Sequence, residues 1–267
     1  MKKTLRIAAL FIALTLLTGV FSSIALADGE TPVVTSATAD PQYTAEADVL
    51  KDLGLFQGRN SGYELEKAAT RAEAATMLVR LLGLEEEVEA GEYEHPFTDV
   101  PAWADNVVGY MYEEGLTKGV SATKFAANSP CEAKMYVTFV LRALGYDEAD
   151  EDFAYNSAVT DAIFLNVIDG GLALGLLEKT FLRGDMVMIS FAALTANVKV
   201  EEGEDDMTLL DKLVEEGAVD AEKAEANEDA LNDYAEYREN WTPEVDDADD
   251  VDDEEDDDDA DDEGDDE

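Results

Sequence analysis

The chain contains one cysteine, Cys131, and one histidine, His95, among its 267 residues. A single Cys excludes an intrachain disulfide, and one Cys with one His cannot supply the ligands of a Cys/His zinc site. No Cys–His nucleophile pair with an orienting network is evident, so most enzyme chemistries lack their usual residues. We expect Cys131 to be a packed thiol, with intermolecular pairing as the alternative, and His95 to be an exposed linker residue.

Basic residues are also scarce: 18 Lys and Arg stand against 64 Asp and Glu, for a formal net charge of −46. This balance excludes a nucleic-acid binder, which needs Lys and Arg to neutralise phosphates. Hydrophobic residues nevertheless make up 46% of the chain, enough for a packed core. The acidity is concentrated in 244–267, where 19 of 24 residues are Asp or Glu, and self-repulsion predicts a disordered tail.

Long apolar runs are limited to one, Ile7 to Val20, near the start of the chain. Lys2, Lys3 and Arg6 precede it, and Ala25-Leu26-Ala27 follows, which is the order of a secretory signal with its cleavage site. We therefore predict a signal peptide over 1–27, with a retained membrane anchor as the competing interpretation. No second apolar span follows, so we expect no membrane span after signal removal.

An internal repeat organises residues 42–199. Gly54-Leu55-Phe56-Gln57-Gly58 recurs 61 residues later from Gly115, and Val79 to Gly83 recurs 62 residues later as Leu141 to Gly145. A weaker third copy places Arg183 at Arg71 with an offset of 112. The predicted organisation is a signal peptide (1–27), a linker (28–41), three repeats (42–96 with an acidic loop, 97–152 and 153–199), a charged helical extension (200–243) and the acidic tail (244–267).

Each repeat has the pattern of a helix, a loop and a second helix. Apolar residues before Gly54 and before Gly115 recur at helical spacing, and each glycine is placed to close its helix. Thr70 to Glu73 has the pattern of a capping box that begins the second helix, and Ser129 to Glu132 fits the same box. Short helix pairs cannot cover their own apolar faces, so we expect a mainly α fold in which the repeats pack around a shared axis.

Together these motifs resemble S-layer homology (SLH) domains. The resemblance rests on the box from Thr70 to Glu73, on Phe97-Thr98-Asp99-Val100-Pro101 followed by Trp103, and on the spacing of Gly115 and Gly119. The segment from Phe181 through Arg183 and Asp185 resembles a divergent third repeat. The resemblance implies a pseudo-threefold set of helical repeats whose grooves bind a secondary cell-wall polysaccharide, in some cases a pyruvylated one.

On this resemblance, the wall-polymer residues are Arg71, Asp99, Trp103, Lys118 and Arg183, and the structural motif residues are Thr70, Glu73, Phe97, Gly115, Gly119 and Asp185. A guanidinium can bind a sugar-linked carboxylate in a bidentate fork, and an indole offers a flat face to a sugar ring. The best-equipped groove is expected to combine Arg71 with Asp99 and Trp103. Cys131 to Lys134 departs from the box in the second repeat.

Structural alternatives remain open for these side chains: a solvated helix-start arginine at Arg71, a packed indole at Trp103, and a helix cap at Asp99. Helices are also expected over 207–216 and from Ala221 to Trp241, docked on the repeats or on a partner. The acidic tail lacks the loop spacing of an EF-hand, so any Ca²⁺ or Mg²⁺ binding would be weak and diffuse.

The sequence thus predicts a secreted, non-enzymatic cell-surface protein that is anchored to wall polysaccharide and can self-associate in a surface layer. The alternative is a soluble extracellular protein that buffers divalent cations or binds a partner through its acidic tail. A glycosidase is disfavoured, since abundant surface acids carry no sign of a paired acid and base.

Overall fold

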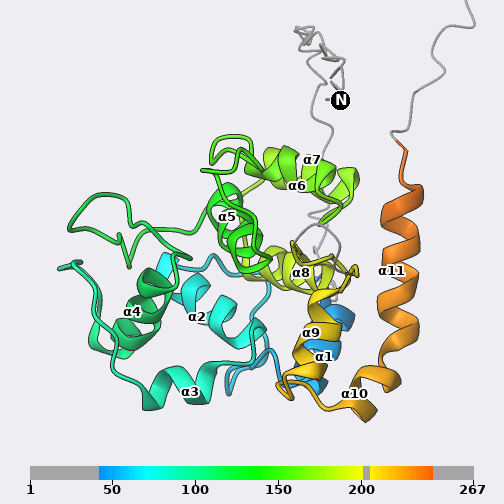
Figure 1. Ribbon diagram of the computed structural model, residues 1–267, viewed down its shortest axis with the longest axis horizontal. Helices are drawn as coiled ribbons and strands as arrows, with labels where there is room; N and C mark the ends of the chain where they lie inside the picture. Colours follow the sequence, from blue (N-terminus) through cyan, green and yellow to red (C-terminus); the bar gives the residue numbers. More distant parts are fainter. Residues whose placement is uncertain (1–41, 201–204, 243–267) are drawn as a thin grey trace, which may run out of the picture. The chain divides into compact units, whose positions relative to one another are not determined.

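Residues 42–200 and 205–242 are described by the computed structural model, and Figure 1 shows their arrangement. The predicted signal peptide, most of the linker and the acidic tail lie outside the described residues. The described part is helical and contains isolated β-bridges but no β-strand, which confirms a mainly α fold. Its elements are α1 (Thr44–Asp52), α2 (Arg71–Leu81), α3 (Glu85–Ala90), η1 (Ala102–Ala104), α4 (Asp105–Glu113), α5 (Ala133–Ala143), α6 (Ala158–Phe164), α7 (Gly170–Glu178), α8 (Arg183–Leu194), α9 (Leu209–Glu215), α10 (Ala221–Ala226) and α11 (Glu228–Asn240).

The start of α2 is fixed by the predicted capping box. The Thr70 backbone N–H donates to the Glu73 carboxylate at 2.9 Å, and the Glu73 N–H donates to the Thr70 hydroxyl at 3.3 Å. Two backbone donors that the helix leaves free are thereby satisfied. The box places Arg71 at the first position of the helix.

The second predicted box, Ser129 to Glu132, is wrong. Helix α5 begins at Ala133, and the residue before it, Glu132, makes no side-chain capping hydrogen bond. Pro130 instead forms an isolated antiparallel bridge with Thr70. These residues are used to join α5 to the head of α2, so Ala133 stands in the position that Arg71 holds in α2.

Three helices, α2, α5 and α8, contact one another at the centre of the fold, and each carries an outer helix. Helix α1 packs on α8, α4 packs on α2, and α6 packs on α5. All three central helices are heavily buried, and α8 is buried at every residue from Gly184 to Leu194. Tyr136 on α5 and Ser190 on α8 share a buried hydrogen bond of 2.7 Å, which satisfies both hydroxyls within the core.

Backbone hydrogen bonds tie the heads of two central helices to distant loops. The N–H groups of Arg71 and Ala72 donate to the carbonyls of Ser129 and Ala127, at 2.9 and 3.0 Å. At the head of α8, the Arg183 N–H donates to the Lys67 carbonyl at 2.8 Å, and the Gly184 N–H donates to the Leu65 carbonyl at 2.9 Å. These free helix-start donors are thus satisfied by loops rather than by water.

The C-terminal helices dock on the rest of the fold. Helices α9 and α11 both contact α8, and Figure 1 shows α11, in orange, beside it. The single helix expected from Ala221 is instead two, α10 and α11, which meet at Asn227. Docking on the repeat region is therefore confirmed.

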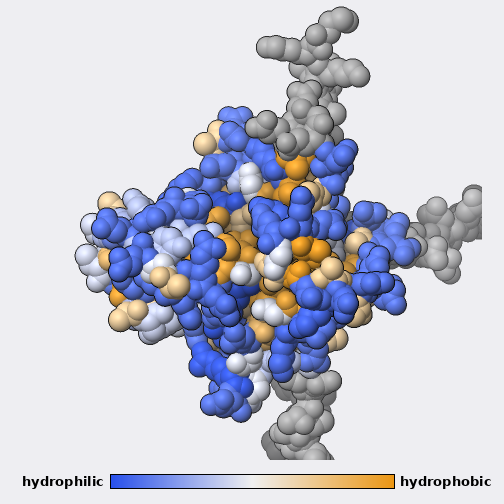
Figure 2. Space-filling model, turned by 60° about the horizontal axis from the view of Figure 1, so that its bottom comes forward, coloured by the Kyte–Doolittle hydropathy of each residue, from blue (hydrophilic) through white to orange (hydrophobic). Residues whose placement is uncertain are grey.

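The surface reflects the composition. Figure 2 shows a largely hydrophilic face on which hydrophobic residues gather near the middle. None of the helices within 42–200 and 205–242 is long and apolar enough to cross a membrane.

Leu78→Ala should strongly destabilise the fold, because Leu78 lies on α2 with 0% of its surface exposed. We expect a loss of about 2–5 kcal/mol in the free energy of unfolding from denaturant titration, from lost burial and the cavity left behind. Leu177→Ala, at an exposed leucine of α7, is the matched control and should change stability by less than about 0.5 kcal/mol. Equal losses in both variants would contradict the assignment of the central helices as the core.

Candidate functional site

Arg71 is a buried arginine at the head of α2, with 7% of its surface exposed. Its guanidinium carbon lies 4.8 Å from the ring centroid of Phe125 and 5.1 Å from that of Phe139. Both distances suit cation–π attraction, which is stronger away from water. Two aromatic rings therefore hold the guanidinium in one place.

The polar groups around Arg71 satisfy little of its hydrogen-bonding capacity. One Nη2 contact reaches the Thr117 hydroxyl at 3.5 Å, and the buried Nε has no partner in the described part of the chain. No ion pair joins Arg71 to a carboxylate among those residues, although the chain has 64 acidic side chains. Burial lowers the pKa of Arg71, but an arginine stays charged in a protein. The result is a buried cation without a counter-ion.

This guanidinium lines a cavity of about 350 Å³, here called the first cavity. Its cationic residues are Arg71, Lys118 and Arg142, against one acidic residue, Glu148. Tyr155 lies at its edge and is partly exposed. The remaining lining residues are Gly119, Val120, Met135, Thr138 and Phe139. The excess of positive charge is unusual in so acidic a chain and suits an anionic ligand.

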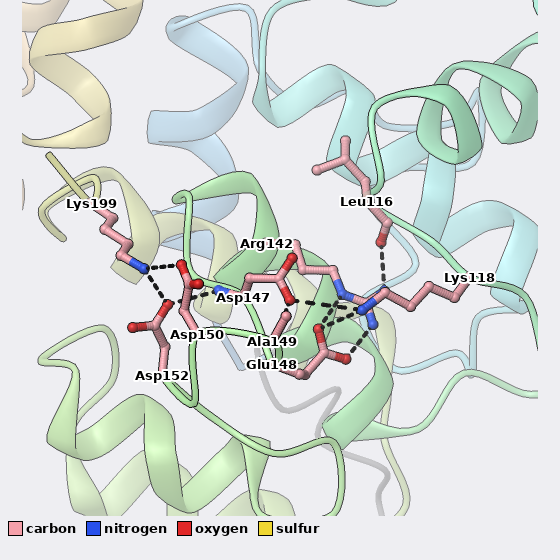
Figure 3. A network of polar contacts seen from close by, with 9 residues as sticks. All are labelled: Leu116, Lys118, Arg142, Asp147, Glu148, Ala149, Asp150, Asp152 and Lys199. Carbon is pink, nitrogen blue, oxygen red and sulfur yellow. Dashed lines mark hydrogen bonds and ion pairs between the residues drawn. The ribbon is translucent and has the colours of Figure 1, made fainter. Parts of the chain in front are cut away.

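Figure 3 shows the polar network at the other side of this cavity. Arg142 donates from Nε to Glu148 Oε2 at 3.1 Å and from Nη1 to the Leu116 carbonyl at 3.1 Å. Lys118 reaches Glu148 at 3.2 Å, so the predicted anion contact already has one carboxylate partner. These hydrogen bonds, that from Arg142 first, lower the pKa of Glu148 to about 2. Farther along the loop, Lys199 bridges Asp150 and Asp152 at 2.8 and 2.7 Å.

A second cavity, of about 660 Å³, contains Trp103 and Arg183. Trp103 is 61% exposed, so its indole presents an open apolar face. Arg183, at the head of α8, is half-buried and donates from Nε to the Tyr63 carbonyl at 3.3 Å. Arg59 and Arg80 also line this cavity and pair with Glu73 and Glu85.

Arg71 and Trp103 therefore do not share a cavity, contrary to the expected grouping with Asp99. Each Asp99 oxygen accepts a backbone N–H at 2.9 Å, one from Phe125 and the other from Ala126. Burial acts to raise the pKa of Asp99, but these hydrogen bonds and nearby Lys124 lower it overall. Asp99 does not cap η1 either, since Pro101 precedes that helix without a side-chain cap. Its carboxylate orders the loop that carries Phe125 beneath Arg71.

The other motif residues shape the same loops. Gly119 has φ +68°, and a Cβ there would lie 2.3 Å from Phe97, so the ring packs directly on its backbone. Gly115 closes α4 with φ +72°, as predicted. Asp185 accepts the Leu182 N–H at 2.8 Å at the start of α8 and pairs with Lys179.

Both rare residues are packed. Cys131 is buried, and burial raises the pKa of its thiol. The prediction for His95 is wrong, because only 7% of its side chain is exposed. It stacks on Phe97 and lies 3.2 Å from Asp105. Across the described ranges, no group of three or more His, Cys, Asp or Glu side chains is arranged to hold a metal ion.

Sequence reasoning missed the arginines that complete each cavity, Arg80 and Arg142. Both stand in the motif that recurs at an offset of 62 residues, Val79 to Gly83 and Leu141 to Gly145. The repeated arginine was therefore a visible signal. What the repeat did not reveal is that these arginines face the cavities beside Arg183 and Arg71.

Comparisons with known proteins identify one family. Residues 96–131 match the S-layer homology domain. The chain is 32% identical over 180 residues to a "Cell surface protein" of Thermoanaerobacter kivui, covering 66% of this chain and 23% of that protein. It is 31% identical over 147 residues to the "Middle cell wall protein" of Brevibacillus brevis, covering 54% and 14%. It is 32% identical over 124 residues to the "Surface layer protein" of Brevibacillus choshinensis, covering 45% and 11%. The chain thus spans less than a quarter of the length of these relatives.

Glu148→Gln should destabilise the protein near neutral pH, because the charged hydrogen bonds from Arg142 and Lys118 are weakened. Glu148 has a pKa of about 2 against an ordinary 4.5, so its stabilisation is present above about pH 4.5 and is lost as the pH falls toward 2. We expect a difference in unfolding free energy of about 1–2 kcal/mol at pH 7 that shrinks below pH 4.5. Exposed Glu92→Gln is the control, and a difference independent of pH would contradict the assignment.

Proposed function

We propose that this S-layer homology domain protein of the cell surface is held non-covalently on the bacterial cell wall by a secondary wall polysaccharide, which binds in the two cavities described above. The names of its relatives point to a structural protein rather than an enzyme. Because the chain spans only part of those relatives, self-association in a surface layer is likewise a proposal about the whole assembly.

We further propose that residues 42–199 form three SLH-like repeats around a pseudo-threefold axis. The contact pattern supports this arrangement, because the outer helix of each proposed repeat packs on the central helix of the preceding one, and α1 closes the ring on α8. The loop contacts at the heads of α2 and α8 also correspond. Their donors are related by an offset of 112 residues and their acceptors by an offset of 62.

The observation that carries the proposed function is the buried, unpaired guanidinium of Arg71. Burying a charge without a counter-ion costs free energy, and a merely structural site is better served by an apolar side chain of similar size. The first cavity adds Lys118 and Arg142 next to it. An incoming carboxylate, such as a pyruvate ketal on a sugar, would accept charge-assisted hydrogen bonds from these groups.

The second cavity suits a neighbouring sugar unit. Trp103 offers an apolar face for a sugar ring, and Arg183 lies in the same cavity. Most of the other charges there already form pairs, such as Arg59 with Glu73 and Arg80 with Glu85. This cavity is therefore proposed to bind through stacking and hydroxyl contacts more than through charge.

The net charge of −46 does not prevent binding of an anionic polymer. Salt at about 0.1 M screens exposed charges over roughly 10 Å, so distant acidic segments contribute little within the cavity. Local groups dominate, and in the first cavity these are mainly cationic.

Arg71→Met separates function from structure. It removes the charge but keeps an unbranched apolar side chain between Phe125 and Phe139, so the unfolding free energy should stay level or rise. Binding to purified wall sacculi should fall by at least about tenfold, the value of one or two charge-assisted hydrogen bonds. The measurement is co-sedimentation with sacculi before and after their secondary polymers are stripped.

Lys212→Ala, a partly exposed lysine on α9 outside both cavities, controls for loss of positive charge. A chain lacking 244–267 controls for the acidic tail and should bind as the full chain does. Undiminished binding by Arg71→Met, or binding that survives stripping of the polymers, would refute the proposal.

Trp103→Ala should weaken binding to the sacculi several-fold through loss of the stacking face. Because the indole is largely exposed, thermal stability should change little. Exposed Tyr237→Ala, far along the chain on α11, is a matched aromatic truncation. Equal binding by Trp103→Ala and the unmodified chain would remove the second cavity from the proposed site.

A further inference from the structure

The third repeat lacks the arginines that line the two cavities. Arg80 on α2 and Arg142 on α5 occupy corresponding positions, and an offset of 112 residues from Arg80 leads to Ala192 on α8. Likewise, the residue of α5 that corresponds to Arg71 is Ala133. Ala192 is completely buried, so this side of α8 is covered.

An arginine from the C-terminal extension takes the missing position. Arg238 on α11 is 7% exposed and donates from Nη1 to the Thr195 hydroxyl at 2.8 Å and from Nη2 to the Thr195 carbonyl at 3.0 Å. Nη1 also lies 3.4 Å from the carbonyl oxygens of Ala192 and Val167.

The contact with Val167 corresponds to one already described. Arg142 donates to the Leu116 carbonyl, and Leu116 directly follows Gly115, which closes an outer helix at positive φ. Val167 directly follows Asn166, which has φ +54° after α6. Arg238 thus reaches the same point of the third repeat that Arg142 reaches in the second, but from a different helix.

Aromatic residues of α11 complete the cover. The Tyr234 hydroxyl donates to Asp169 Oδ2 at 3.1 Å, and its ring meets Phe191 edge-on with centroids 5.8 Å apart. Trp241 lies so close to Gly170 that a Cβ there would be 2.3 Å from the indole. The head of α7 and the end of α8 are therefore both covered by α11.

We infer that α11 permanently occupies the third inter-repeat groove, so that wall polymer binds at the two remaining cavities and not at three. This inference rests on the proposed function and names the number of sites in it. The grooves at α2 and α5 keep their arginines and stay open. The groove at α8 has lost them, and Arg238 with its aromatic neighbours serves as an internal occupant.

Hydrogen exchange with mass spectrometry tests the occupancy of the third groove. Arg238→Ala in the full chain should speed exchange of amides in 163–171 and 192–198 by about tenfold or more, because the hydrogen bonds of α11 to both segments are lost. Segments 55–60 and 116–121 should exchange as before. Glu236→Ala, at an exposed residue of the same helix, is the control and should change neither set.

Trp241→Ala serves as a second variant in case Arg238→Ala unfolds globally, which uniform acceleration of all segments would reveal. Unchanged exchange of 163–171 in folded forms of both variants would overturn the inference.

A second arm adds polysaccharide released from purified sacculi to the unmodified chain. Binding at two cavities should slow exchange in 55–60 and 116–121 but not in 166–171. Protection of all three segments would overturn the inference while leaving wall binding intact. Protection of none would instead refute the proposed function, so the two failures are distinguishable.

Discussion

The mutual packing of α2, α5 and α8 is the constraint on which the rest of the structure depends. Each short helix carries more apolar surface than it can bury alone, and the three together bury it at a common centre. Their positions decide where each helix begins, and the loop hydrogen bonds at the heads of α2 and α8 lock those beginnings in place. Arg71 and Arg183 are buried or half-buried because they are the first residues of packed helices.

The arginines of this chain divide by how their charge is satisfied. Arg80 and Arg142 pair with Glu85 and Glu148, and Arg238 donates to carbonyl and hydroxyl oxygens. Arg71 differs, since aromatic rings hold it while its described neighbours supply one long hydrogen bond. In a chain with 64 acidic residues, a carboxylate partner would be easy to place. Its absence from the described surroundings is the physical reason to assign Arg71 to a ligand.

The C-terminal extension belongs to the architecture. It supplies Arg238 to a repeat whose own arginine position holds Ala192, and it covers backbone that would otherwise face water. Buried carbonyls need partners, and a guanidinium satisfies several at once. Divergence of the third repeat and retention of α11 are thus two sides of one structural solution.

Local features of the sequence determined much of the fold. Thr70 and Glu73 predict the start of α2 and Gly115 predicts the end of α4, because caps depend on neighbouring residues alone. Recurrence at 61 and 62 residues likewise predicts corresponding helices. Ser129 misled for the same local reason: its pattern suits a cap, but the adjoining Pro130 is used in a bridge to Thr70, far away in the sequence.

Tertiary structure alone decided which side chains meet. Arg71 and Trp103 belong to one motif frame, yet they line different cavities, because each cavity forms between repeats rather than within one. Asp99 was placed in the site by its motif, but the fold turned both of its oxygens to loop amides. Sequence spacing orders residues along a helix, whereas the distance between residues on different helices is set by how the helices pack.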